Sequence, residues 1–191
     1  MTKAIPYLPQ EYLDNCKVLS NRFEMLDLLP KNGTYAEVGV LHGDYSEEIL
    51  KRCNPERLYL IDLFLMYDRH YEDIKNKFYP KNNVNIQEGF SWEVLSEFPD
   101  KYFDFIYIDA GHSYKDVKRD AMVARHKIKD DGYLIFNDYI LYNNFAKEVE
   151  EFGVCYVVHE LCLKHDYEFK YLALHPYLFN DVCLRKRGID G

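Results

Sequence analysis

Short apolar runs alternate with longer polar segments through the middle of the chain. The runs are TYAEV (34–38), RLYLID (57–62), NVNIQ (83–87), FDFIYID (103–109) and GYLIFND (132–138). Continuous apolar runs are typical of strands buried on both faces, and the segments between them are long enough for helices. The alternation therefore predicts a parallel sheet with crossover helices.

Two segments have the spacing of amphipathic helices. Within residues 8–29, apolar side chains recur every three or four positions, which predicts an N-terminal helix inside residues 1–30. Between Ser113 and Lys129, apolar residues again fall on one helical face, and Ser113 is a suitable N-cap.

The last part of the chain, residues 153–191, is predicted to contribute strands. GVCYVVHELC (153–162) and NDVCLRK (180–186) are apolar runs of strand type, whereas the aromatic-rich segment between them, 163–179, has no assigned element. No repeat, low-complexity tract or linker divides the chain, so residues 1–191 are expected to form a single domain.

Charge and cysteine content narrow the setting in which the protein works. The chain has 24 Lys and Arg against 32 Asp and Glu, a net charge of -8, which argues against nucleic acid and membrane partners. No apolar run approaches the roughly 20 residues of a membrane span, and the N-terminus lacks a signal-peptide core. Five scattered cysteines without a CxxC pair indicate reduced thiols. We expect a cytoplasmic protein.

Polar residues follow the first predicted strand in the sequence AEVGVLHGDYS. Ligands of open parallel sheets bind at the carboxyl ends of the strands, which directs attention to Glu37, Gly39, Gly43 and Ser46. Leu41 stands where a dinucleotide fingerprint needs glycine, and the acid that follows would repel a pyrophosphate, so a nicotinamide cofactor is disfavoured. An acidic glycine turn suits the ammonium and sulfonium groups of S-adenosylmethionine. The alternative is a turn that merely joins strand to helix.

The next two strand ends extend this interpretation. Asp62 can accept the hydroxyls of a ribose, or else cap a helix. Phe90 and Trp92 could flank an adenine whose edge is read by Ser91 or nearby backbone, although Trp92 could equally belong to the core.

The fourth and fifth runs end in Asp109 with His112, and in Asn137 with Asp138. Neighbouring parallel strands lie about 4.8 Å apart, so the oxygen-bearing side chains could surround one hard cation such as Mg²⁺ or Ca²⁺. His112 is either a proton acceptor beside that cation or a structural histidine.

The ordered set of these motifs resembles the class I S-adenosylmethionine-dependent methyltransferases. The resemblance covers residues 33–140 and is greatest to the macrocin and mycinamicin type of small-molecule O-methyltransferase, and more distant to the catechol type. It implies a Rossmann-like, doubly wound α/β fold with a mostly parallel seven-stranded sheet, helices on both faces and an antiparallel last strand.

The resemblance also implies roles for individual residues. Glu37, Gly39, Gly43, Ser46, Asp62 and Ser91 would hold the cofactor, with Asp109 beside them; Asp109, Asn137 and Asp138 would bind Mg²⁺; and His112, with Asp109, would be catalytic. One departure is that Asn137 stands where the macrolide sugar enzymes carry an acid.

The function expected from these features is O-methylation of a small polar acceptor, such as a sugar or sugar-bearing natural product. The alternative is a protein that binds S-adenosylmethionine but is catalytically inactive. We expect residues 64–73 and 165–179 to cover the acceptor. The sequence leaves the acceptor's identity and homo-oligomer formation open.

Overall fold

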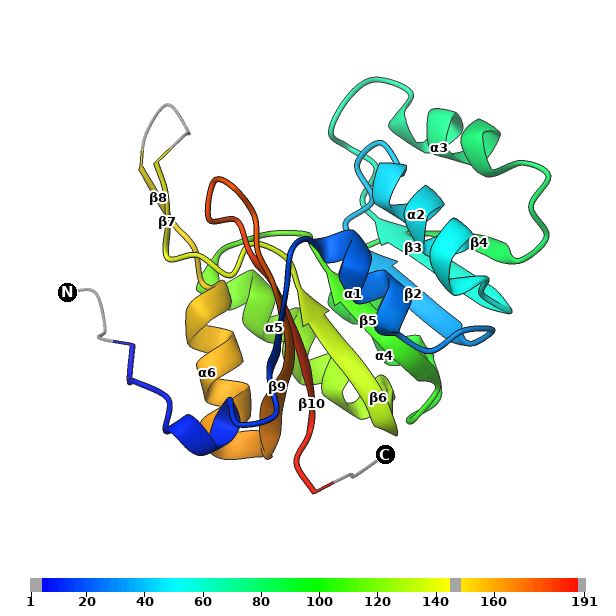
Figure 1. The fold of residues 1–191 in the computed structure, drawn as a ribbon. Helices are drawn as coiled ribbons and strands as arrows, with labels where there is room; N and C mark the ends of the chain where they lie inside the picture. Colours follow the sequence, from blue (N-terminus) through cyan, green and yellow to red (C-terminus); the bar gives the residue numbers. More distant parts are fainter. Residues whose placement is uncertain (1–4, 145–148, 189–191) are drawn as a thin grey trace.

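The computed structural model describes residues 5–144 and 149–188. A central sheet with the strand order β1-β9-β10-β6-β5-β2-β3-β4 organises the molecule (Figure 1). Its strands are β1 (Lys17–Leu19), β2 (Thr34–Val38), β3 (Arg57–Asp62), β4 (Val84–Glu88), β5 (Phe103–Ile108), β6 (Ile128–Phe136), β9 (Tyr167–Ala173) and β10 (Asp181–Lys186). A separate hairpin pairs β7 (Tyr142–Asn143) with β8 (Glu150–Glu151).

The predicted fold class is confirmed, with one more strand than expected. Strands β2 to β6 pair in parallel, and β10 is antiparallel to both β6 and β9. Over the described residues the sheet has eight strands rather than seven, because β1 adds a parallel edge strand to β9.

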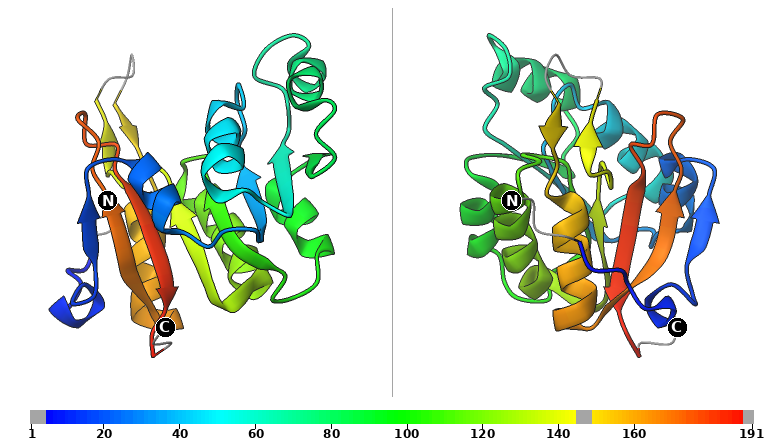
Figure 2. Two further views of the ribbon diagram at one scale, coloured as in Figure 1. Left: turned by 45° about the vertical axis from the view of Figure 1, so that its right-hand side comes forward. Right: turned by 90° about the vertical axis from the view of Figure 1, so that its left-hand side faces the viewer.

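Helices cover both faces of the sheet. They are α1 (Arg22–Leu28), α2 (Asp44–Cys53), α3 (His70–Phe78), α4 (Ser91–Glu97), α5 (Tyr114–Lys127) and α6 (Val154–His165). One buried cluster joins the sheet to α4, α5 and α6, and a second joins it to α1, α2 and α3. The right-hand view of Figure 2 shows the blue and cyan helices on the side opposite the green ones.

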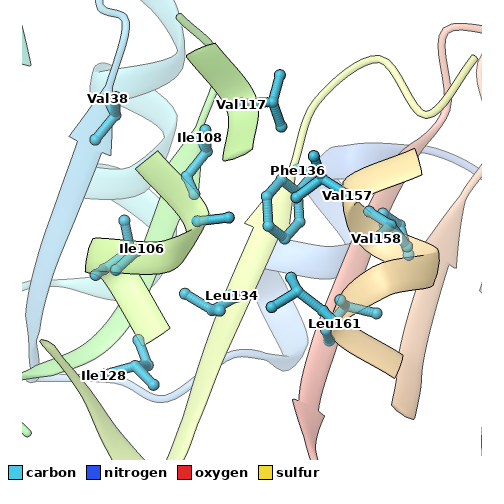
Figure 3. Close-up of a cluster of buried hydrophobic side chains, with 14 of the residues drawn as sticks. Val38, Ile106, Ile108, Val117, Ile128, Leu134, Phe136, Val157, Val158 and Leu161 are labelled. Carbon is cyan, nitrogen blue, oxygen red and sulfur yellow. The ribbon is translucent and has the colours of Figure 1, made fainter. Parts of the chain in front are cut away.

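Strand side chains alternate between these two clusters. Tyr35 packs toward α1, α2 and α3, whereas its neighbour Ala36 packs toward the other three helices. Figure 3 shows the cluster that joins the sheet to α4, α5 and α6, where Leu134 and Phe136 of β6 lie against Val157 and Leu161 of α6. Both faces of the central strands are therefore buried, as their continuous apolar runs predicted.

The predicted N-terminal helix is wrong over its first half. Gln10–Tyr12 form one 3-10 turn (η1), Lys17–Leu19 form β1, and α1 begins only after Asn21. The side chain of Asn21 accepts hydrogen bonds from two backbone N–H groups of the first turn and so fixes where the helix starts. Residues 1–4 of the predicted range lie outside the described residues.

The C-terminal part is also corrected. The predicted strand 153–162 is helix α6, since Val154, Val157, Val158 and Leu161 recur at helical spacing and are buried on one face. The unassigned aromatic segment supplies β9, while NDVCLRK forms β10 as predicted. Residues 189–191 lie outside the described part.

Helix α5 agrees with the sequence pattern. It begins after Ser113, whose hydroxyl oxygen accepts a hydrogen bond from the backbone N–H of Asp116. Among the described helices, none has the length and apolar character required to cross a membrane.

Candidate cofactor and active site

A cavity of about 770 Å³ opens at the carboxyl ends of β2, β3 and β5. The predicted site residues that line it are Glu37, Gly39, Asp62, Ser91, Asp109 and His112. The predicted site residues that do not line it are Gly43, Ser46, Asn137 and Asp138. The strand-end rule therefore brings the first group together at one cavity.

The turn after β2 requires glycine at two positions. Gly39 has a φ of 85°, and a Cβ there would lie 2.0 Å from the backbone oxygen of Asp109. Gly43, with a φ of 72°, is the N-cap of α2 and packs against the ring of Phe78. Any side chain at residue 39 would push the turn away from the end of β5.

Glu37 is a buried acid beneath this turn. It is 1% exposed and accepts a hydrogen bond from the hydroxyl of Ser46, in the first turn of α2. Burial raises the pKa of Glu37 to about 8, although the Ser46 hydrogen bond opposes this. A cation in the cavity would favour the charged form of Glu37.

Asp62 shapes the same turn from the end of β3. One carboxylate oxygen accepts from the backbone N–H of Val40 at 2.7 Å, and the other accepts from that of Phe64 at 2.9 Å. These bonds bind loop backbone and cap no helix. The first of these oxygens, Oδ2, also accepts a long hydrogen bond from the backbone N–H of Leu41 at 3.4 Å, so Oδ1 is the oxygen with capacity for a ribose hydroxyl.

The aromatic pair at α4 differs from the prediction. Phe90 and Trp92 stack on each other with ring centroids 4.8 Å apart and an interplanar angle of 20°. A base between them would need a separation of about 7 Å, twice an ordinary carbon contact distance. The two rings therefore cannot flank an adenine. Trp92 instead stacks under the guanidinium of Arg119 at 4.8 Å.

Ser91 has a partner that the sequence did not indicate. Its hydroxyl donates a hydrogen bond to the carboxylate of Asp120, a residue of α5 that is 1% exposed and lines the cavity. Burial raises the pKa of Asp120 to about 6. The hydroxyl hydrogen of Ser91 is thus engaged with a buried acid.

His112 lines the cavity after the end of β5 and lies between two carboxylates. Its Nε2 is 3.3 Å from Asp138 Oδ2 and 3.6 Å from Asp109 Oδ1. The imidazole stacks on Phe152, with centroids 4.5 Å apart and planes 14° from parallel. Nε2 is buried without a hydrogen-bond partner among the described residues. Packing against Phe152 therefore holds the ring in place, and its Nε2 lies close to two carboxylates without a hydrogen bond to either.

The two carboxylates control the protonation of this histidine. Burial alone would lower the pKa of His112, but attraction to Asp109 and Asp138 outweighs it, so the pKa is raised above 6.5. Burial raises the pKa of Asp138 to about 6 and also raises that of Asp109. Because the three groups lie this close together, the protonation state of each one depends on the other two.

The predicted Mg²⁺ site is not supported by this geometry. The side-chain nitrogen of Asn137 donates to the hydroxyl of Tyr107 and to Asp181, both at 3.1 Å; these bonds use the nitrogen, whereas a cation would be coordinated by the oxygen. Between Asp109 and Asp138, the Nε2 of His112 lies within 3.6 Å of an oxygen of each carboxylate. No group of three or more His, Cys, Asp or Glu among the described residues could hold a metal ion.

Sequence analysis missed two further cavity residues, Arg22 and Tyr45. Arg22 is the only Lys or Arg among the described lining residues and donates to the hydroxyl of Tyr107 at 3.3 Å. Its guanidinium lies 4.9 Å from the ring centre of Tyr45, whose buried hydroxyl has no hydrogen-bond partner among the described residues. The only sequence signal was Asn21, which places Arg22 at the start of a helix.

The comparisons with known proteins agree with this arrangement. The family model described as a methyltransferase domain matches residues 36–139, which is more than half of the chain. The match contains every predicted cofactor and metal residue from Glu37 to Asp138. No curated protein matches the sequence.

Solved structures share the fold at low sequence identity. A protein of Corynebacterium glutamicum is 16% identical, with a TM-score of 0.66 over 86% of this chain and 80% of that one. The precorrin-6y C5,15-methyltransferase of Geobacter metallireducens is 15% identical, with a TM-score of 0.63 over 86% of each chain. The M1A22 tRNA methyltransferase TrmK of Bacillus subtilis is 15% identical, with a TM-score of 0.62 over 89% of this chain and 67% of that one. The chain therefore belongs to the methyltransferase-domain family, as a class I S-adenosylmethionine-dependent methyltransferase.

Proposed function

We propose that the protein transfers the methyl group of S-adenosylmethionine to a hydroxyl of a small polar acceptor, such as a sugar or sugar-bearing natural product. The observation that carries this proposal is the position of His112, whose unpartnered Nε2 lies at the cavity between Asp109 and Asp138. Methylation of a hydroxyl requires removal of its proton, which a placed imidazole can accept.

The cavity residues fit the charges of the cofactor. S-Adenosylmethionine supplies a methyl group activated by its sulfonium. Glu37 would pair with positive charge at the amino acid end, since burial leaves its carboxyl in need of a cation. Arg22 and the unpartnered hydroxyl of Tyr45 would bind the carboxylate, and Asp62 would accept the ribose hydroxyls.

His112 would act as the proton acceptor at the opposite side of the methyl group. Phe152 fixes the plane of the ring, and the carboxylates of Asp109 and Asp138 stabilise the imidazolium that forms when the ring takes the proton. The proposal includes no metal, because the imidazole of His112 lies between Asp109 and Asp138 and can itself accept the proton.

The two aromatic segments predicted to cover the acceptor differ in structure. Leu65, Met66 and His70 line the cavity beside Asp62, and we propose that this loop covers the cofactor. In the second segment, Tyr167–Ala173 form β9 within the sheet, whereas residues 174–179 belong to the connection to β10, and their role as a cover stays a prediction. We place the acceptor beside His112 and Asp138.

Product formation from a panel of sugars and sugar-bearing compounds tests the proposal. S-Adenosylhomocysteine and product mass are measured for the wild type, for His112→Gln and for His126→Gln, an exposed histidine of α5 that serves as the matched control. His112→Gln should lower turnover by about 10² to 10⁴ while cofactor affinity stays within about twofold. The control should behave as the wild type.

The pH profile adds a second readout. Turnover should rise with pH through a pKa above 6.5, because only the neutral imidazole accepts a proton. Asp138→Asn removes a negative charge, lowers the pKa of His112 and should move this limb to lower pH. Full turnover of His112→Gln would return His112 to a structural role. Cofactor binding without product on any acceptor would favour the inactive binding protein.

A further inference from the structure

Asp120 is a buried acid of the cavity that the proposed transfer does not use. It lies on the face of α5 that meets α4, is 1% exposed, and receives the hydroxyl hydrogen of Ser91 on Oδ1. A buried carboxylate is costly unless its acceptor capacity is filled, and two oxygens accept more than one hydrogen bond. The cavity is the place from which a further donor can reach it.

The surroundings of Asp120 define the chemistry of that donor. Asp116, one turn earlier on α5, also lines the cavity and adds negative charge, while Ser91 gives its hydrogen to Asp120. Arg119, which stacks on Trp92, is not among the described lining residues, so the charged side chains that line this end are hydrogen-bond acceptors. A ligand edge that carries N–H groups is favoured here, and one that carries a carbonyl oxygen is repelled.

The cofactor's base is the part that extends to this end. With the amino acid portion at Glu37 and the ribose at Asp62, the cavity lining beyond them includes residues 89–92, at the start of α4, and Asp120 of α5. Because the rings of Phe90 and Trp92 stack on each other, the base cannot enter between them. It must instead contact the side of the cavity that α4 and α5 form.

We propose that Asp120 is a specificity-determining residue, which selects adenine by accepting a hydrogen bond from its exocyclic amino group. This inference rests on the proposed placement of S-adenosylmethionine in the cavity. Hypoxanthine carries an oxygen at the same position, which Asp120 would repel. Ser91 holds the carboxylate in place and acts through it.

Calorimetric titration with S-adenosylhomocysteine and S-inosylhomocysteine tests the assignment at pH 8. At that pH the Asp120 carboxyl, whose pKa is raised by burial to about 6, is ionised. The wild type should bind the adenosyl ligand about tenfold or more tightly than the inosyl ligand. In Asp120→Asn the amide can donate to the inosine oxygen, so this preference should fall by about fivefold or more.

A matched control separates this effect from the loss of any buried acid. Glu168→Gln changes a buried carboxylate of β9 that pairs with Arg185, and it should leave the preference unchanged. A purely structural role of Asp120 would weaken both ligands equally. Equal binding of the two ligands by the wild type would overturn the inference even if Asp120→Asn did not fold, and would leave the proposed function standing. A wild type that binds neither would overturn both.

Discussion

At the residue scale, the cavity contains carboxylates that stand at the ends of parallel strands. Glu37, Asp62 and Asp109 reach one cavity because parallel strands end at the same edge of the sheet, a relation that the apolar runs already contain. Arg22, Tyr45 and Asp120 reach the same cavity from helices. Their arrival depends on how those helices pack across the sheet, which no local pattern specifies.

The hydrogen-bond partners of Asn137 and Ser91 could not be predicted from the sequence either. Their places in the chain were correct, but the Asn137 amide is bonded to Asp181, a residue of β10 that is 44 positions away. The Ser91 hydroxyl meets an acid on α5. Hydrogen bonds over such sequence separations are set by tertiary packing, so the predicted metal ligand set could not be tested from spacing alone.

The pKa of Glu37 makes a prediction about cofactor binding and pH. Burial raises its pKa from 4.5 to about 8, so its contribution to stability is full below pH 4.5 and is lost as pH rises toward 8. A positively charged cofactor group favours the ionised form, so binding should release a proton. Affinity for S-adenosylmethionine, measured by calorimetry, should increase about tenfold or more from pH 6 to 8.

Glu37→Gln isolates this effect. The amide keeps the size and can still accept the Ser46 hydrogen bond, but it carries no charge at any pH. The variant should bind weakly at pH 8 and lose most of the pH dependence, whereas Glu168→Gln should keep it. A pH dependence that survives in Glu37→Gln would assign the proton to another group.

At the scale of elements, the strands were predicted more accurately than the terminal segments. The five central runs differ from β2 to β6 by a few residues at most, because strands buried on both faces leave continuous apolar sequence. The valine-rich start of α6 resembles a strand by composition, yet its buried residues recur at helical spacing. In α6 packing against the sheet decided the structure, and β-propensity did not.

The β2–α2 turn supports a prediction at the same scale. Gly39→Ala places a methyl group 2.0 Å from the backbone oxygen of Asp109, at a φ of 85° that alanine rarely adopts. Either the turn or the end of β5 must move, and both line the cavity. Calorimetry should show cofactor affinity reduced by about tenfold or more, as expected for a displaced binding loop.

Gly188→Ala is the comparison for this variant. Gly188 also has a positive φ, of 76°, but a Cβ there meets no atom within 4 Å. Strain without a clash should cost only about 1 kcal/mol of stability and leave cofactor affinity unchanged. Normal affinity in Gly39→Ala would mean that the turn does not contact the cofactor.

At the scale of the whole molecule, the cavity lies where both helical layers meet the ends of the strands. Arg22 and Tyr45 come from the layer of α1 and α2, whereas Ser91 and Asp120 come from the layer of α4 and α5. A ligand that spans the cavity therefore contacts elements on both faces of the sheet. Its binding should stabilise the folded chain as one unit.

Thermal unfolding measures that stabilisation, and it also tests whether ligand binding depends on Mg²⁺. A ligand at about 100 times its Kd adds about 2.7 kcal/mol to the free energy of unfolding, which for a chain of this size raises Tm by roughly 5 to 10 °C. We expect S-adenosylhomocysteine to produce this shift equally in EDTA and in excess Mg²⁺, because the imidazole of His112 lies between the carboxylates of Asp109 and Asp138. Asp62→Ala should reduce the shift, since it removes a cavity carboxylate and the acceptor for the Val40 backbone. A Tm that rises with Mg²⁺ in the wild type but not in Asp138→Asn would contradict the metal-free arrangement and make Asp138 a ligand.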